Sequence, residues 1–299
     1  MFRHPEDRLP LLLMFGLFCV DVSVYLFVDH WFLLLAYALL SMLPKAGICA
    51  FNHHHQHVST FHYAWANRLL ELMYVLQTGV SSQAWVLHHS LGHHLHYLDQ
   101  TKDESRWARD DGSRMGEWEY AWVTTITAYP RAWAVGAKHP RQRRIFLVMG
   151  LLSLALMAAL VAYRPLAGAL IFVMVPLGML FGTALATYTH HSDRATDNDF
   201  VACNNIIQRF YNVFTGNLGY HTAHHHRPGM HWSKLPALHA EILPKIPKEA
   251  FTMPGVPWRW FGKCEGAENF APYTVALAKQ AEAELAEAPH VGAPRQAAS

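Results

Sequence analysis

The sequence predicts an all-α integral membrane protein with four transmembrane helices, and three observations support that prediction. Hydrophobic residues make up 52% of the chain and charged residues only 15%, whereas soluble domains carry about 25% charged residues. The apolar residues concentrate in four stretches near the ~20 residues that a bilayer core requires. Twenty-two histidines gather mainly in short clusters beside those stretches. Because imidazole is the commonest metal-binding side chain, the clusters indicate a metal-binding membrane protein.

The four expected spans cover about residues 9–28, 31–51, 145–163 and 166–188. Only residues 29–30 join the first span to the second, and only residues 164–165 join the third to the fourth. Such short connections force neighbouring helices to run antiparallel. The sequence therefore predicts two hairpins, each of which begins and ends on the same side of the membrane.

The distribution of basic residues predicts which side that is. Of 24 Lys and Arg residues, two precede the first span, ten lie in residues 52–144 and ten lie from residue 192 onward. Only Arg164 falls in a turn on the far side. The positive-inside rule therefore places both termini, and a histidine-rich cap formed by the clusters, in the cytoplasm. We interpret the first apolar run as a retained span, since no small-residue cleavage site follows it.

Two further apolar segments, residues 69–87 and 120–137, are interrupted by polar side chains or rich in Trp and Tyr. We expect helices that lie in the membrane interface rather than additional spans. Residues 1–265 are then one membrane domain. Residues 266–299, rich in Ala and Glu and ending in a Pro/Ala stretch, are expected to form a partly disordered tail.

The remaining composition excludes several classes of protein. A formal net charge of +2 and the absence of a basic tract argue against binding to nucleic acid. The four cysteines (Cys19, Cys49, Cys203 and Cys264) form no CxxC pair. We therefore interpret them as reduced bystanders, and expect no thiolate metal site.

Three histidine clusters have the spacing of ligands on helices. His53 and His57 are four residues apart, so a helix stacks them on one face. The histidines of the second cluster lie at positions i, i+4 and i+5, and those of the third cluster at positions i, i+3 and i+4. With His191 at the end of the fourth span, nine imidazoles are available, which suits two metal ions with open positions. The second and third sets are His89, His93, His94, His221, His224 and His225.

These residues alone do not identify the metal. Imidazole ligands suit iron, zinc or copper, and neither a zinc-protease motif nor paired Glu-x-x-His motifs of a soluble di-iron bundle lie at these clusters. The other histidines are expected not to be ligands, although some could orient a ligand by hydrogen bonding. Candidate acidic partners for such contacts are Asp99, Asp103, Asp193, Asp197 and Asp199.

The ordered set of clusters resembles the histidine boxes of the membrane fatty acid desaturases and of the related alkane and carotenoid hydroxylases. Residues 53–57 match the first box as HxxxH, residues 89–94 the second as HxxxHH, and residues 221–225 the third as HxxHH. The second form is similar to the alkane hydroxylases. Residues 187–191 resemble an additional T-Y-x-x-H element that selects His191 over His190. Two registers stay open: His57 with His62 in place of His53 with His57, and His88 in place of His89.

The resemblance implies two non-haem irons held by histidine, O2 as co-substrate, and two electrons from a separate carrier of the ferredoxin, rubredoxin or cytochrome type. A cluster of arginines that could attract an acidic carrier lies between the second and third spans: Arg106, Arg109, Arg114, Arg141, Arg143 and Arg144. The leading hypothesis is a desaturase that introduces a double bond into an acyl-lipid or acyl-carrier chain, in a bacterial inner membrane. The alternatives are an alkyl or terpenoid hydroxylase of the same superfamily and, less favoured, a histidine-rich metal transporter.

Overall fold

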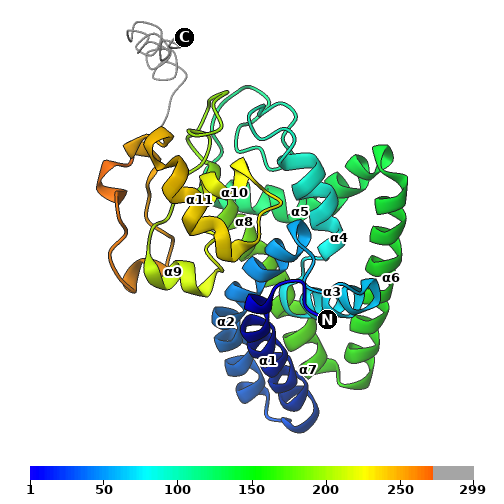
Figure 1. The fold of residues 1–299 in the computed structure, drawn as a ribbon. Coiled ribbons are helices and arrows are strands. Elements are labelled where there is room, and N and C mark those ends of the chain that lie inside the picture. The colour runs from blue at the N-terminus through cyan, green and yellow to red at the C-terminus, as the bar shows by residue number, and fades with distance from the viewer. Residues whose placement is uncertain (272–299) are drawn as a thin grey trace, which may run out of the picture.

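The computed structural model describes residues 1–271, and all the named elements in that range are helices. Most of the predicted tail, residues 272–299, lies outside the described range. Figure 1 shows α1, α2 and α7 in the lower half, α6 along the right edge, and α10 and α11 in the upper half. The α-helices are α1 (Arg8–Phe27), α2 (Trp31–His57), α3 (Ala64–Thr78), α4 (Ser82–Trp85), α5 (Glu117–Val135), α6 (Pro140–Tyr163), α7 (Pro165–Ala169), α8 (Val175–His191), α9 (Arg209–Phe214), α10 (His221–His226) and α11 (Leu235–Ile242).

Two π-helical segments interrupt this pattern, η2 (Val86–His93) after α4 and η4 (Leu170–Met174) between α7 and α8. Short 3₁₀ turns complete the chain. They are η1 (Pro5–Asp7), η3 (Gly136–Lys138), η5 (Trp232–Lys234), η6 (Leu243–Lys245), η7 (Lys248–Ala250), η8 (Trp258–Trp260) and η9 (Ala267–Asn269).

Four helical stretches are long and apolar enough to cross a membrane: Pro5–Phe27, Trp31–His57, Pro140–Tyr163 and Pro165–His191. Each of the four predicted spans coincides with one of them, and only the first, at residue 28, extends one residue beyond its helix. The second and fourth stretches continue past the predicted ends by several residues, and these extra turns carry His53, His57 and His191. The first and third expose large apolar side chains such as Leu12 and Leu154, as lipid-facing helices do.

An ion pair inside the apolar bundle joins the first two spans. Lys45 Nζ lies 2.7 Å from Asp21 Oδ1, and the Tyr37 hydroxyl donates a hydrogen bond to the same oxygen at 2.8 Å. Both charged side chains are almost wholly buried. Removing one partner would leave an unpaired buried charge, which typically costs about 3–5 kcal/mol.

Contacts of Arg164 bring the two short turns together at one end of the bundle. Its guanidinium donates to the carbonyl oxygen of Val28 at 3.0 Å and contacts the Asp29 carboxylate. The Tyr25 hydroxyl donates to Leu160 O at 2.7 Å on the same side. Figure 1 shows this end at the bottom, opposite α10.

The prediction of one continuous interfacial helix over residues 69–87 is wrong, because the structure divides this segment into separate helices. Helix α3 ends at Thr78 because Gly79 adopts a left-handed conformation with φ of +67°, and α4 begins only at Ser82. A Cβ at Gly79 would collide with the backbone of Pro176, so only glycine fits this turn. Most of α3 is buried in the protein, with Trp65 and Leu69 exposed. Neither α3 nor α5 is among the candidate spans.

Candidate metal centre

The histidine clusters meet at the end of the spans opposite the two short turns, and the helices that carry them end there. His57 is the last residue of α2 and His191 the last of α8. The second cluster lies in η2 and just beyond it, and the third forms α10. Four separate segments therefore converge on one site, although His53 and His225 are 172 positions apart in the sequence.

The imidazoles sort into two groups of possible metal ligands. In the first, which we term the five-imidazole group, all ligand atoms lie within 4.8 Å of one another. The second, which we term the Cys203 group, is equally compact and contains a thiol. The five-imidazole group is His53, His57, His89, His94 and His224; the Cys203 group is His191, Cys203, His221 and His225.

The nitrogens in the five-imidazole group face one another across a common centre. His89 Nε2 lies 2.7 Å from His53 Nε2 and 3.0 Å from His94 Nε2. His94 Nε2 in turn lies 3.1 Å from His224 Nε2. Ligands of one metal ion at about 2.1 Å are roughly 3 Å apart when adjacent. The spacing therefore fits nitrogens that share an ion.

The second group repeats this spacing on its own side. His191 Nε2 lies 2.9 Å from His221 Nε2 and 3.2 Å from His93 Nε2. His93 thus adjoins the Cys203 group, although it belongs to the second cluster in sequence. The ring of His94 stacks on that of His225 with centroids 4.2 Å apart. The two groups are therefore neighbours, as a dinuclear site requires.

The π-helical turn explains how the second cluster divides between the groups. The His94 amide donates to His89 O at 2.9 Å, a bond between residues five apart. Such i→i+5 bonds stack residues five positions apart on one face, so His89 and His94 enter the same group. His93 then projects toward His191. The third cluster is divided in the same way, since His224 joins one group and His221 and His225 join the other.

Burial keeps these imidazoles neutral, as metal ligation requires. Desolvation, reinforced by the surrounding imidazoles, lowers the pKa of His89, His94 and His224 well below the usual value. The pKa values of His221 and His225 fall for the same reasons. A neutral ring offers a lone pair to a cation.

Several buried nitrogens lack the hydrogen-bond partner that burial normally demands. Within residues 1–271, His57 Nε2 and both ring nitrogens of His225 have no partner. His225 is only 5% exposed, so bulk water does not compensate. Metal ions at the centres of the two groups would satisfy such nitrogens. The residues present therefore fit a pair of histidine-bound ions.

One carboxylate orients a histidine of the site from outside. Asp103 is 2% exposed, and its Oδ1 lies 2.8 Å from His93 Nδ1. Carboxylates placed in this way fix the tautomer of a ligating ring and make it more basic. The other four candidate aspartates do not contact the ligand rings: Asp99 pairs with Lys102, Asp193 with Arg114, Asp199 with Tyr97, and Asp197 is exposed.

The structure distinguishes between the open registers. His62 is exposed and belongs to neither group, whereas His53 and His57 both lie in the five-imidazole group. His88 is buried outside both groups, and burial lowers its pKa to about 4. His190 is held by Asn204 O at 3.1 Å and the Tyr211 hydroxyl at 3.0 Å. The geometry thus favours His53, His89 and His191 over their neighbours.

Sequence reasoning missed one residue of the site. The cysteines are expected to be bystanders, yet Cys203 lies within the second group of possible ligands. Ten or more residues separate it from every ligand histidine in the sequence, so no spacing motif marks it. The four cysteines are free thiols, as predicted.

A third collection of possible ligands, His4, Glu6 and His231, lies away from the two groups. Both ring nitrogens of His231 already have partners, with Nε2 3.1 Å from Asp7 Oδ1 and Nδ1 2.9 Å from Ser233 Oγ. This arrangement ties the N-terminus to η5 and explains the buried carboxylate of Asp7.

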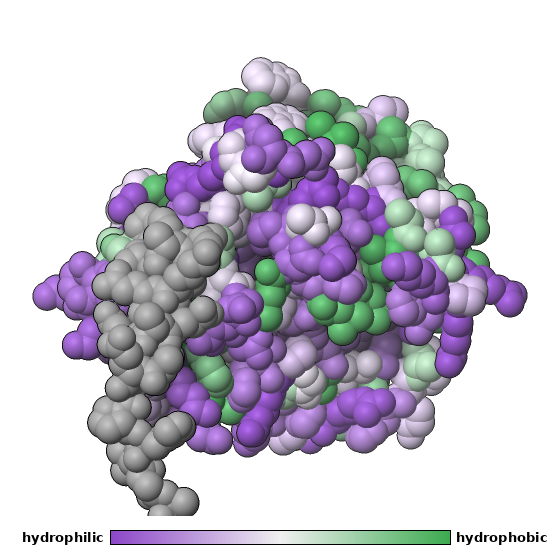
Figure 2. Space-filling model, turned by 90° about the horizontal axis from the view of Figure 1, so that it is seen from above, coloured by the Kyte–Doolittle hydropathy of each residue, from purple (hydrophilic) through white to green (hydrophobic). Residues whose placement is uncertain are grey.

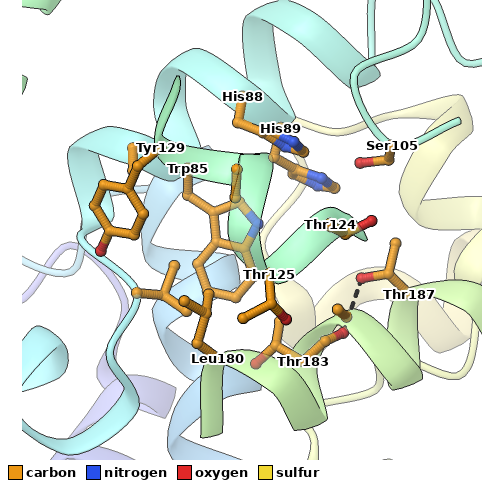
Figure 3. A pocket seen from close by; sticks show the side chains of 14 residues that line it. Trp85, His88, His89, Ser105, Thr124, Thr125, Tyr129, Leu180, Thr183 and Thr187 are labelled. Atoms are coloured by element: carbon orange, nitrogen blue, oxygen red, sulfur yellow. Dashed lines mark hydrogen bonds between the residues drawn. The ribbon is translucent and has the colours of Figure 1, made fainter. Parts of the chain in front are cut away.

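A cavity adjoins the five-imidazole group. About 520 Å³ of space, part of it open to the surface, lies between α4–η2, α5 and α8. His89 lines it directly, beside the indole of Trp85, as Figure 3 shows. The walls are mostly apolar, with hydroxyl groups from Thr124, Thr125, Thr183, Thr187 and Ser105.

Spans that place buried imidazoles at one end define an integral membrane protein with a potential dinuclear metal centre. A family model described as fatty acid desaturase matches residues 29–257. The chain belongs to the fatty acid desaturase family, which implies an oxidoreductase that acts on lipids at a membrane. No curated protein and no solved structure gave a match.

Proposed function

We propose that this protein is an O2-dependent di-iron desaturase that introduces a double bond into the alkyl chain of an acyl lipid or an acyl carrier. The observation that supports this most directly is the arrangement of a mostly apolar cavity against His89, which is itself part of the five-imidazole group. A chain in that cavity would present a carbon to the metal centre.

The proposed ligands are the eight histidines of the two groups together with His93 beside them: His53, His57, His89, His93, His94, His191, His221, His224 and His225. Two bound irons would supply the O2-dependent redox chemistry that removal of hydrogen from an unactivated alkyl chain requires. The protein contributes ligation, exclusion of water and positioning of the chain. Trp85 and Leu180 form apolar walls that would fix the chain and keep water out.

The overall reaction requires electrons from outside the chain. Conversion of a –CH2–CH2– unit to –CH=CH– removes two hydrogens, and reduction of O2 to two waters consumes those and two further electrons and protons. A separate carrier of the ferredoxin, rubredoxin or cytochrome type would supply the electrons. The arginines expected to attract it are partly neutralised, since Arg109 pairs with Glu119, Arg114 with Asp193 and Arg106 with Asp110.

We further propose that α1–α2 and α6–α8 form two membrane hairpins within a domain of residues 1–265, with the metal centre in a cytoplasmic cap. The excess of Lys and Arg on the histidine side supports that orientation. Figure 2, which views the molecule from above, shows a largely hydrophilic face at this end with apolar patches among the polar side chains. A bacterial inner membrane is the setting that this topology suits.

The position of the donor groups disfavours a transporter. Transport sites lie near the middle of the bilayer, whereas His57 and His191 end their helices. The HxxxHH form of the second box resembles the alkane hydroxylases, so the product of the reaction decides between hydroxylation and desaturation.

The test is mass spectrometry of lipids and small hydrophobic metabolites from cells that express the protein, with the His224→Ala variant as control. We expect products lighter by two hydrogens that depend on O2, on a reductant and on His224. Products heavier by one oxygen would instead identify a hydroxylase. Metal flux into proteoliposomes without any oxidised product would identify a transporter.

A further inference from the structure

Cys203 is held against the metal centre by the segment between α8 and α9. It is fully buried. The amide of the next residue, Asn204, donates to His190 O at 2.7 Å, and its side-chain Nδ2 donates to Thr189 O and Ser192 O at 3.1 Å each. These bonds tie the backbone beside Cys203 to the end of α8, the helix that carries His191.

The surroundings of the thiol are those of a ligand rather than of a small apolar core residue. Its sulfur and one ring nitrogen each of His191, His221 and His225 all lie within 4.8 Å of one another. Ligands on opposite sides of one ion, at about 2.1 Å for nitrogen and 2.3 Å for sulfur, are roughly 4.4 Å apart. The four atoms therefore have nearly the spread of a single coordination shell.

A second observation points to a missing ligand partner at the same place. His225 is 5% exposed, yet neither of its ring nitrogens has a hydrogen-bond partner within the described part of the chain. A buried imidazole with no partner is costly unless something binds it. A cation among His191, His221, His225 and the thiol would satisfy it.

We propose that Cys203 is a thiolate ligand of the second metal ion, so that the two irons of the proposed centre have different donor sets. The inference rests on the proposed metal centre. The five-imidazole group supplies neutral nitrogen donors, whereas the Cys203 group would supply one anionic, soft sulfur donor. The thiol would lose its proton as the metal binds, and the negative sulfur would favour the oxidised state of that iron.

The experiment is iron K-edge X-ray absorption on the full-length, iron-loaded protein in detergent. We expect a sulfur scatterer at about 2.3 Å in addition to nitrogen. Cys203→Ser should lose that scatterer and hold one of the two irons roughly ten- to a hundredfold more weakly, as metal content after dialysis measures. Replacing iron by cobalt(II) gives a second readout, because a thiolate adds a sulfur-to-metal absorption band that imidazole does not.

Cys264→Ser is the matched control. That thiol is also buried, but it donates to Thr252 O at 3.0 Å and lies outside both groups. The variant should keep the sulfur scatterer and both irons. Wild-type protein with two irons but nitrogen and oxygen scattering alone would overturn the inference while leaving the metal centre in place. Wild-type protein that binds no metal would overturn both.

Discussion

The two donor groups share α10 but differ in their other supporting segments and in their chemistry. The five-imidazole group takes ligands from α2, η2 and α10, and all five donors are imidazoles. The Cys203 group takes its histidines from α8 and α10, adds a thiol, and adjoins a histidine backed by the Asp103 carboxylate. The cavity lies against the first group through His89.

This difference indicates a division of roles. Anionic sulfur and a carboxylate-backed imidazole donate more electron density than neutral imidazoles, so they would stabilise the higher oxidation state of the nearer metal. The five-imidazole group is the one that faces the cavity. We therefore expect changes near Cys203 to alter redox properties, and changes near His89 to alter handling of the alkyl chain.

The largest loss of iron and activity should come from single variants that each remove one donor, His224 from the five-imidazole group or His225 from the Cys203 group. His224→Ala and His225→Ala should each lower bound iron from about two towards about one per chain, and lower product formation by more than roughly a hundredfold, because each removes a direct ligand. Membrane insertion should persist. Metal analysis and product assays check this, with exposed His62→Ala as the silent control. Full activity in His224→Ala would contradict the assignment of the five-imidazole group.

Adjacent histidines in η2 provide the next test. His89→Ala should lose iron from the five-imidazole group, whereas His88→Ala should retain both irons, because only His89 lies among the donors. We expect activity to differ between the two variants by at least roughly tenfold. Iron content of the purified variants is the measurement. Iron loss in His88→Ala, with both irons retained in His89→Ala, would reverse the register.

The carboxylate behind His93 should have an intermediate effect confined to the second group. Asp103→Asn removes the charge while keeping the size of the side chain, and should weaken metal affinity or activity by roughly 10–100-fold. Asp99→Asn, on an exposed aspartate paired with Lys102, is the control and should behave as wild type. Iron titration of both variants compares them; identical affinities would show that Asp103 has no influence on the metal.

Filling the cavity should have the smallest effect and should spare the metals. Ala128 lines the cavity on α5, so Ala128→Leu should shorten the chains accepted or reduce activity by roughly tenfold while both irons stay bound. Ala134→Leu, at an exposed position of the same helix, is the control. Product profiles for substrates of different length measure this. An unchanged profile in Ala128→Leu would place the substrate elsewhere.

Much of the architecture could be predicted from local sequence. Apolar runs of bilayer length predicted all four spans, because burial in lipid needs a continuous apolar surface that any reader of the sequence can see. The break at Gly79 could not be predicted in the same way. A glycine in an apolar segment is compatible with a continuous helix, and only the approach of Pro176 makes the left-handed turn necessary.

The sequence by itself determined that the histidine clusters lie near one another at the span ends, because span topology places them on the same side of the membrane. The tertiary structure alone decided how they are shared: the π-helical turn sends His89 and His94 to one group and His93 toward the other. It also decided that Cys203 joins them, since its position depends on hydrogen bonds between Asn204 and the end of α8. Spacing along a chain fixes directions within one helix, whereas the meeting of side chains from separate helices depends on how those helices pack.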